Sequence, residues 1–216
     1  MQQIPRLQCR GEDKRRQICK DYRIIPKAHF RILNGVSIHS DAGDTMTEEY
    51  FIFDAVNKND SSRIYNIYCG AFVAKSFAKL AGITLPPIYN PLRSVSHSSS
   101  NERGNNRSTD NQYSHKWNDE RKQLYDIVMI TMMYLGEIRT DLPLFDIKQK
   151  LESNVSYPPF DSYIQAVNTI LGNLNLKFTH ILDILRSKNI MKEFEYDLIL
   201  KRIENNPKIK QQNITD

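Results

Sequence analysis

The sequence lacks the features that mark membrane and secreted proteins. No apolar run approaches the ~20 residues that a helix needs to cross a bilayer. Residues 1–20 carry charges throughout and contain no continuous apolar segment of the kind found in secretory signals. The chain has only three cysteines, an odd number that suits a reducing compartment better than a disulfide framework. These absences predict a cytoplasmic protein with no membrane span, although unconventional export leaves no such signal in a sequence.

Metal-binding spacings are missing as well. Nine residues separate Cys9 from Cys19, whereas a zinc knuckle places two to four residues between its cysteines. The five histidines form neither an H-x3-H nor an H-E-x-x-H pattern. We therefore expect no metal and no other cofactor.

What the chain does contain is an ordinary globular composition with a mild excess of positive charge. It has 216 residues, 40% of them hydrophobic and 25% charged, which is enough for a substantial core. The net charge of +5 favours the approach to nucleic acid, an anionic membrane or an acidic partner, but it does not identify which of them the protein binds. Five basic residues fall between Arg10 and Lys20, and this run is more typical of a solvated face or a flexible arm than of a nucleic-acid patch.

A change of composition divides the chain. Residues 93–115 are almost entirely serine, asparagine, arginine and other polar types, so they cannot bury enough apolar area to form a core and are predicted to be a flexible linker. The linker separates an α/β unit at 1–92 from a helical bundle at 116–206, which a frayed tail at 207–216 follows. The predicted fold class is α+β: a small N-terminal unit with a β-hairpin and a strand-plus-helix element, followed by an all-α bundle.

The C-terminal half shows clear helical periodicity. The clearest apolar stripe follows Pro158-Pro159 and ends at Gly172. It consists of Phe160, Tyr163, Ile164, Val167, Ile170 and Leu171. The same spacing predicts five helices in all, at 117–137, 145–151, 160–171, 178–185 and 190–198.

The N-terminal half reads as strands. Asn34-Gly35 between apolar stretches is the strongest short hairpin signal, and it predicts a hairpin of strands 29–33 and 36–39. His29 and His39 then lie on these strands. A further strand at 49–56 contains Asp54.

Cys69 lies where a predicted strand, 64–68, meets a predicted amphipathic helix, 70–81. The unpaired N–H groups and the positive dipole end of a helix start favour a thiolate over a thiol. The position therefore suits a nucleophile. The alternative is a core thiol, because free cysteines are among the most buried residue types.

The order histidine, acid and then Cys-Gly-x-Phe at a helix start, with the segment YCGAFVAKSFAKLAGITLPP, resembles the circularly permuted papain-like thiol enzymes. These include the NlpC/P60-like amidases, the Ulp-type proteases and the YopJ-type acetyltransferases. The segment YFIFDAV is similar to the strand that ends in their acid. The resemblance covers residues 29–87 and implies that Cys69 is the nucleophile, His39 or else His29 the base, and Asp54 the orienting acid. Ile64 stands where the Ulp-type and YopJ-type enzymes carry a glutamine.

Two functions of different class follow. The first, which we favour from the sequence, is a thiol-dependent hydrolase or acyltransferase that acts on a peptide, isopeptide or amide bond of a protein substrate through the Cys-His-Asp arrangement. The second is a non-catalytic basic adaptor that binds a partner protein or nucleic acid through its helical half, with Cys69 in the core. Nucleic acid is the less favoured partner, because Gln165, Asn168 and Asn173 are the only obvious base-reading candidates on the bundle. A homo-oligomer is compatible with either function.

Overall fold

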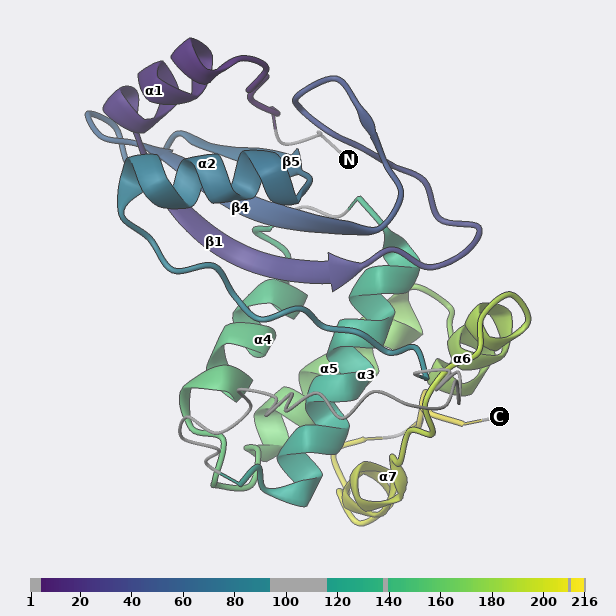
Figure 1. The fold of residues 1–216 in the computed structure, drawn as a ribbon. Coiled ribbons are helices and arrows are strands. Elements are labelled where there is room, and N and C mark those ends of the chain that lie inside the picture. Colours follow the sequence, from purple (N-terminus) through teal and green to yellow (C-terminus); the bar gives the residue numbers. More distant parts are fainter. Residues whose placement is uncertain (1–4, 94–115, 138–139, 210, 216) are drawn as a thin grey trace, which may run out of the picture.

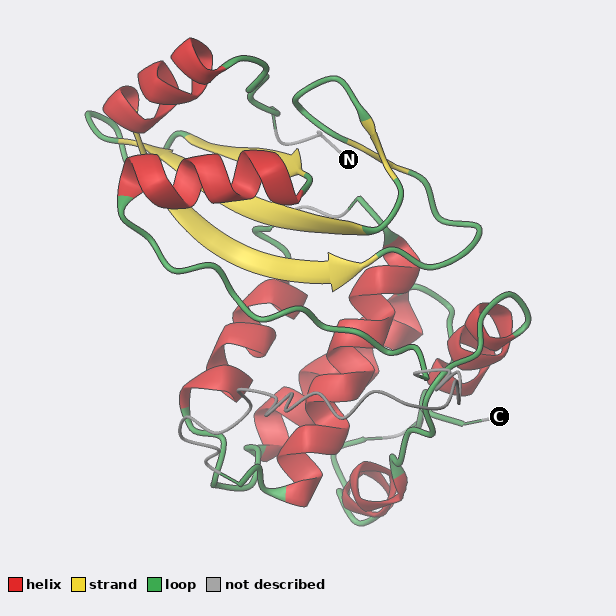
Figure 2. Ribbon diagram, in the orientation of Figure 1, coloured by secondary structure: helices red, strands yellow, loops and turns green. Residues whose placement is uncertain are grey.

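The computed structural model describes residues 5–93, 116–137, 140–209 and 211–215. Within this part of the chain, an antiparallel sheet carries two helices on one face and a bundle of five helices on the other (Figures 1 and 2). The α+β architecture predicted from the sequence is confirmed. Most of the predicted linker, residues 94–115, lies outside the described residues.

The main sheet has three strands in the order β1-β4-β5, namely Tyr22–Arg31, Glu49–Asn57 and Ile64–Cys69. Each neighbouring pair is antiparallel, and the central strand β4 is buried along most of its length. Pro26 lies beside a register shift in β1, which tolerates proline because it is an edge strand.

Two helices cover one face of this sheet. Helix α1 (Glu12–Asp21) precedes β1, and helix α2 (Ala71–Ala81) follows β5 directly. Helix α2 starts after Gly70 and ends at Gly82, whose φ of 65° is the left-handed conformation that glycine adopts without steric cost, so the predicted helix at 70–81 is confirmed. Beneath the two helices is a compact group of buried residues, here called the α1–α2 core. It comprises Cys9, Ile18, Ile24, Ala42, Phe51, Phe53, Ala55, Ile67, Cys69, Val73, Ala74 and Phe77.

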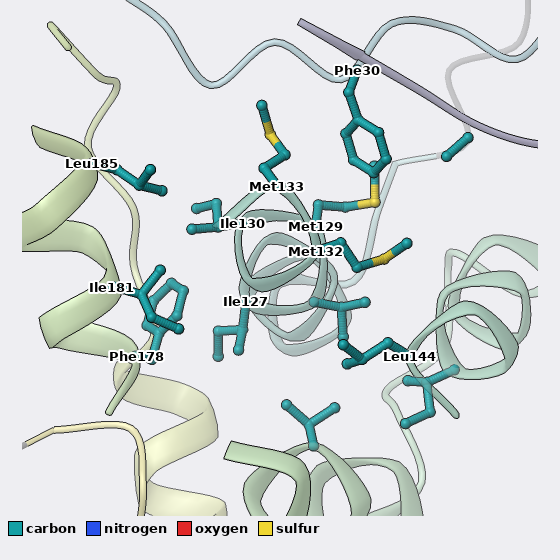
Figure 3. Close-up of a cluster of buried hydrophobic side chains, with 14 of the residues drawn as sticks. Phe30, Ile127, Met129, Ile130, Met132, Met133, Leu144, Phe178, Ile181 and Leu185 are labelled. Atoms are coloured by element: carbon teal, nitrogen blue, oxygen red, sulfur yellow. The ribbon is translucent and has the colours of Figure 1, made fainter. Parts of the chain in front are cut away.

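The opposite face of the sheet packs on the bundle. Its helices are α3 (Asp119–Leu135), α4 (Pro143–Ser153), α5 (Asp161–Asn173), α6 (Phe178–Arg186) and α7 (Asp197–Glu204). Helix α3 runs through the middle, and Figure 3 shows its side chains reaching Leu144 on one side, Ile181 and Leu185 on another, and Phe30 of β1 above. Sheet and bundle therefore share one continuous core. Four of the five predicted helices are found with small shifts of their ends.

The hairpin predicted at Asn34-Gly35 is wrong. The dipeptide does turn the chain, with the Val36 amide donating to the Leu33 carbonyl at 3.1 Å. However, β1 pairs with β4, whereas β2 (Ile38–His39) pairs with β3 (Thr45–Met46) in a separate small ladder. The turn is held instead by the segment after α6: the Asn34 amide donates to Asn189 Oδ1 at 2.8 Å, and Asn34 Nδ2 donates to the Lys188 carbonyl at 3.1 Å. Tertiary contacts thus override the local hairpin preference.

The C-terminal end also differs from its prediction. The last helix begins at Asp197, not near 190, and Ile190 is 67% exposed in a segment outside the helices. The tail predicted to fray at 207–216 is instead anchored where it is described, since Ile214 is fully buried. The carbonyls of Asn213 and Ile214 accept hydrogen bonds from the first two amides of α6, at 3.1 and 2.9 Å. These amides have no acceptor within their own helix, so the tail caps α6.

None of the helices in the described ranges has the length and apolar character needed to cross a bilayer.

Candidate functional site

Cys69 is the last residue of β5, and its side chain belongs to the α1–α2 core. It is fully buried. Loss of solvent raises the pKa of its thiol well above the ordinary value of 9.0, and the nearby Cys9 and Asp41 act in the same direction. The environment therefore favours the neutral thiol, which is the reverse of what a nucleophile at a helix start would require.

His29 lies on the same face of the sheet as Cys69 but not next to it. Phe51 of β4 stands between them, paired with His29 on one side and with Cys69 on the other. The imidazole stacks on the Phe51 ring, with centroids 3.7 Å apart. Because neighbouring strands are about 4.8 Å apart, the His29 and Cys69 backbones are about 10 Å apart, too far for direct proton transfer.

The ring nitrogens of His29 face other groups. Nδ1 is 3.1 Å from the Pro86 carbonyl oxygen. Nε2 is buried and lies 3.2 Å from Glu49 Oε2, without the alignment of a hydrogen bond. The carboxylate beside His29 is thus that of Glu49 in the same sheet, not that of Asp54.

Asp54 faces the other side of the sheet. Side chains alternate along a strand, so Phe51 and Phe53 point into the α1–α2 core, whereas Asp54 points toward the bundle. Its Oδ1 accepts hydrogen bonds from Asn66 Nδ2, at 2.9 Å, and from the Thr140 hydroxyl. Its interactions therefore link the sheet to the segment between α3 and α4.

His39 is at the surface, with a side chain 74% exposed. Its backbone amide donates to Glu137 Oε1 at 2.9 Å, and its Nδ1 is 3.8 Å from the same oxygen. Arg6 joins this group by pairing with Glu137 Oε2 at 2.5 Å and with Asp41 Oδ1 at 2.8 Å. The cluster ties the N-terminal segment and β2 to the end of α3.

The structure does not assemble the four predicted catalytic residues. Cys69 and His29 share one face of the sheet with an aromatic ring between them, Asp54 occupies the opposite face, and His39 pairs with Glu137. Among the described residues, no group of three histidine, cysteine, aspartate or glutamate side chains converges as a metal site would require.

A different arrangement stands out at the start of α3. Arg121 is 2% exposed, and its guanidinium donates to four backbone carbonyls. Nη1 donates to Lys150 at 3.0 Å and to Leu151 at 3.1 Å, Nε to Tyr157 at 2.5 Å, and Nη2 to Pro158 at 3.2 Å. The first two carbonyls belong to the last turn of α4. The carbonyl oxygens of a last turn have no N–H donor within their own helix. Arg121 thus caps α4 and fixes the loop that follows it.

The loop held by Arg121 exposes two aromatic rings. Its residues 157–160, Tyr-Pro-Pro-Phe, are here called the aromatic knuckle. Tyr157 is 69% exposed and Phe160 is 67% exposed. The Phe160 ring packs edge-to-face on Tyr163, with centroids 5.4 Å apart. The Asn118 amide donates to the Val155 carbonyl at 2.8 Å and adds a further tie to α3.

The apolar spacing predicts that Phe160 belongs to the buried stripe of its helix, and this prediction is wrong. Phe160 precedes the first residue of α5, so it projects outward while Ile164, Val167 and Leu171 are buried. Arg121 was not singled out from the sequence. A signal existed, because Arg121 precedes Leu124 and Val128 by three and seven residues and therefore shares their buried side of α3.

Comparison with protein families matches residues 7–210 to one family, described as "Uncharacterised conserved protein UCP028583". The matched residues include the sheet, both helical layers and the aromatic knuckle with Arg121. Comparison with curated proteins and with solved structures gives no match.

Proposed function

We propose that the chain, which belongs to the family UCP028583, is a non-catalytic adaptor that binds a partner protein through the aromatic knuckle of its helical half. One observation carries the proposal: a fully buried arginine donates to four carbonyls in order to hold a loop whose two aromatic rings face solvent.

Exposed aromatic residues on a rigid support are typical of binding hot spots. Tyrosine and tryptophan lead the residues whose truncation weakens protein interfaces most, and large aromatic side chains bury much apolar area with few rotatable bonds. At the knuckle, Pro158 and Pro159 restrict the backbone, and Arg121 fixes it. The conformational entropy lost on binding is therefore small, because the loop is already ordered.

Catalysis by Cys69 has less support. A thiol nucleophile must reach the substrate and must ionise, and it works with a base within hydrogen-bond reach. Cys69 is fully buried, its pKa is raised, and an aromatic ring stands between it and the histidine on its face of the sheet. These observations favour the role of a core thiol.

The knuckle also indicates the chemistry of its partner. A complementary surface offers an apolar pocket wide enough for the Phe160 and Tyr157 rings and a hydrogen-bond acceptor for the tyrosine hydroxyl. We place the interaction in the cytoplasm, which is supported by the three cysteines, all of them free.

Site-specific photo-crosslinking in the native cell tests the proposal. A photoreactive amino acid replaces Phe160 in the full chain, and a matched control replaces Ile190, an apolar residue that is also 67% exposed. We expect one discrete adduct with a second protein at position 160 and none at position 190. The proposal is overturned by the absence of an adduct at 160, by the same adducts at 190, or by an intramolecular adduct with residues 94–115.

Affinity for the crosslinked protein then provides a quantitative test. We expect Phe160→Ala to weaken binding at least about 30-fold, the effect of a hot spot of about 2 kcal/mol. Its thermal unfolding should stay close to that of the original chain, because the ring is mostly in solvent. Ile190→Ala should leave the affinity unchanged. Equal affinities for the Phe160→Ala variant and the original chain would mean that the knuckle is not the interface.

A further inference from the structure

Two segments with a net excess of positive charge are brought together by the fold. Residues 10–21 and 70–82 contain seven arginines and lysines against three acidic residues, which is +4 of the net charge of +5. About fifty residues separate these segments in the sequence. In the structure, α1 and α2 lie side by side on the face of the sheet opposite the bundle (Figure 1). Their outer surface, here called the α1–α2 face, carries exposed cations from both helices.

The two arginines of α1 bind other side chains, whereas the lysines of this face form no ion pair among the described residues. Arg15 is buried, and its Nε donates to the Ser76 hydroxyl at 2.8 Å, so it joins the two helices. Arg16 forms an ion pair with Glu12 within α1 at 2.5 Å. The four lysines of the two helices are exposed and have no ion pair among the described residues. These lysines are Lys14 and Lys20 of α1 and Lys75 and Lys79 of α2.

An aromatic ring stands among these lysines. Phe72, in the first turn of α2, is 79% exposed, the highest value among the exposed large hydrophobic residues of the described chain. Lys75 and Lys79 follow it by three and seven residues, so the three side chains share one side of the helix. The Arg15 guanidinium carbon lies 5.9 Å from the ring centroid. Arg15 thus lies over the ring, while most of the ring remains in solvent.

We propose that the α1–α2 face binds single-stranded nucleic acid. Lys75 and Lys79, which share the side of α2 with the ring, and the exposed lysines of α1 neutralise phosphates, and Phe72 provides a surface on which one base stacks. Exposed cations beside an exposed ring are the combination that non-specific single-strand binding uses, because every base has a π-face and every nucleotide has a phosphate.

An anionic membrane fits this face less well. A helix that lies on a bilayer inserts a wide apolar face into it. The apolar faces of both helices are already used in the α1–α2 core, where Ile18, Val73 and Phe77 are buried. Phe72 alone is left outside, which is too little for insertion. A duplex fits less well for another reason, since its bases are already stacked on one another.

The inference does not rest on the proposed function. The aromatic knuckle is held by Arg121 in the first turn of α3, whereas the three-stranded sheet meets the segment after the other end of that helix through Asp54 and Thr140. A 17-residue helix is about 25 Å long. The two surfaces therefore lie at opposite ends of the molecule, and one can fail its test while the other passes.

Fluorescence anisotropy with a labelled oligothymidylate of about 20 nucleotides tests the proposal, in buffers from about 50 to 200 mM salt. The full chain is compared with Phe72→Ala and with the double variant Lys75→Glu, Lys79→Glu. A control double variant, Lys201→Glu and Lys208→Glu, changes the net charge by the same amount on exposed positions of the helical half. Thermal unfolding of each variant checks that the fold is kept.

The two kinds of contact predict different salt dependences. Four phosphate contacts give a slope of log affinity against log salt of about −3, which weakens binding about 50-fold over this range. The Lys75, Lys79 double variant should bind at least about 10-fold more weakly at low salt and reduce the slope by about half. Phe72→Ala should weaken binding about 5- to 100-fold at every salt concentration and leave the slope unchanged, because stacking releases no counterions.

Four outcomes would overturn the proposal. The first is that the original chain does not bind the oligonucleotide at low salt. The second is that the control double variant loses as much affinity as the Lys75, Lys79 variant. The third is that a duplex of matching length binds as tightly as the single strand. The fourth is binding to vesicles rich in phosphatidylserine without binding to the oligonucleotide, which would make the face a membrane surface.

Discussion

Replacing Arg121 by methionine should destabilise the protein strongly, although no carboxylate among the described residues pairs with this arginine. The side chain is buried, and its guanidinium donates to four carbonyls of α4 and of the aromatic knuckle. Methionine fills most of the same volume but donates no hydrogen bond. The variant therefore isolates the polar contribution of Arg121 from its packing.

The size of the effect follows from the positions of the four acceptors. A hydrogen bond from a charged donor contributes about 1.5 kcal/mol at the low end, so the two bonds to the last turn of α4 contribute about 3 kcal/mol. The positive charge at the C-terminal end of α4 adds about 0.3–1 kcal/mol. The carbonyls of Tyr157 and Pro158 lie on exposed residues, where water replaces part of the lost interaction. We expect Arg121→Met to lower the free energy of unfolding by about 3–5 kcal/mol.

Chemical denaturation, followed by circular dichroism, measures this difference directly. The melting temperature should fall by about 10 °C, given about 2–4 °C for each kcal/mol in a chain of this size. The matched control is Lys122→Met on the next residue, whose exposed ammonium pairs with Asp126 within the same helix and should contribute under about 0.5 kcal/mol. A loss below about 1 kcal/mol for Arg121→Met, or equal losses for both variants, would refute the anchoring role of Arg121.

Three further results are expected. Ile164→Ala should lower the free energy of unfolding by about 2–5 kcal/mol, because the side chain is 2% exposed, whereas Gln165→Ala should change it little, as calorimetry can check. Iodoacetamide near neutral pH should label Cys19 before Cys69, since Cys69 is fully buried and Cys19 is not; mass spectrometry that finds Cys69 labelled first would contradict its role as a core thiol. Burial raises the pKa of Cys9 from 9.0 to about 12, so between these pH values the folded state keeps a proton that the unfolded chain releases. The contribution of this thiol to stability is therefore present below pH 9 and is lost between pH 9 and 12. Cys9→Ala should flatten this part of the curve of unfolding free energy against pH.

The helical half could be predicted from the sequence because its helices are amphipathic or centrally buried. The stripe of Ile164, Val167 and Leu171 faces the core as its spacing predicts. The error at Phe160 arose because the stripe was extended beyond the helix start. The pattern of apolar residues identifies a face, but it does not mark the first residue of the helix.

The strand pairing could not be predicted, because the partner of each strand is chosen by contacts distant in the sequence. Asn34-Gly35 forms its turn, yet the turn packs against Lys188 and Asn189, more than 150 residues away. β1 pairs with β4 instead, over nine residue pairs with one register shift. A short local preference is outweighed by this longer ladder and by the core on both of its faces.

The candidate catalytic residues show the same limit more sharply. Each residue type was plausible, and Cys69 does end a strand immediately before a helix. What decides their relation is parity along β4: Phe51 pairs with Cys69, so Asp54, three residues further on, must point to the other face of the sheet. The spacing of Asp54 and Cys69 along the chain carries no trace of this register. Once the register is known, the same alternation that separates Asp54 from Cys69 and His29 places the Phe51 ring between His29 and Cys69.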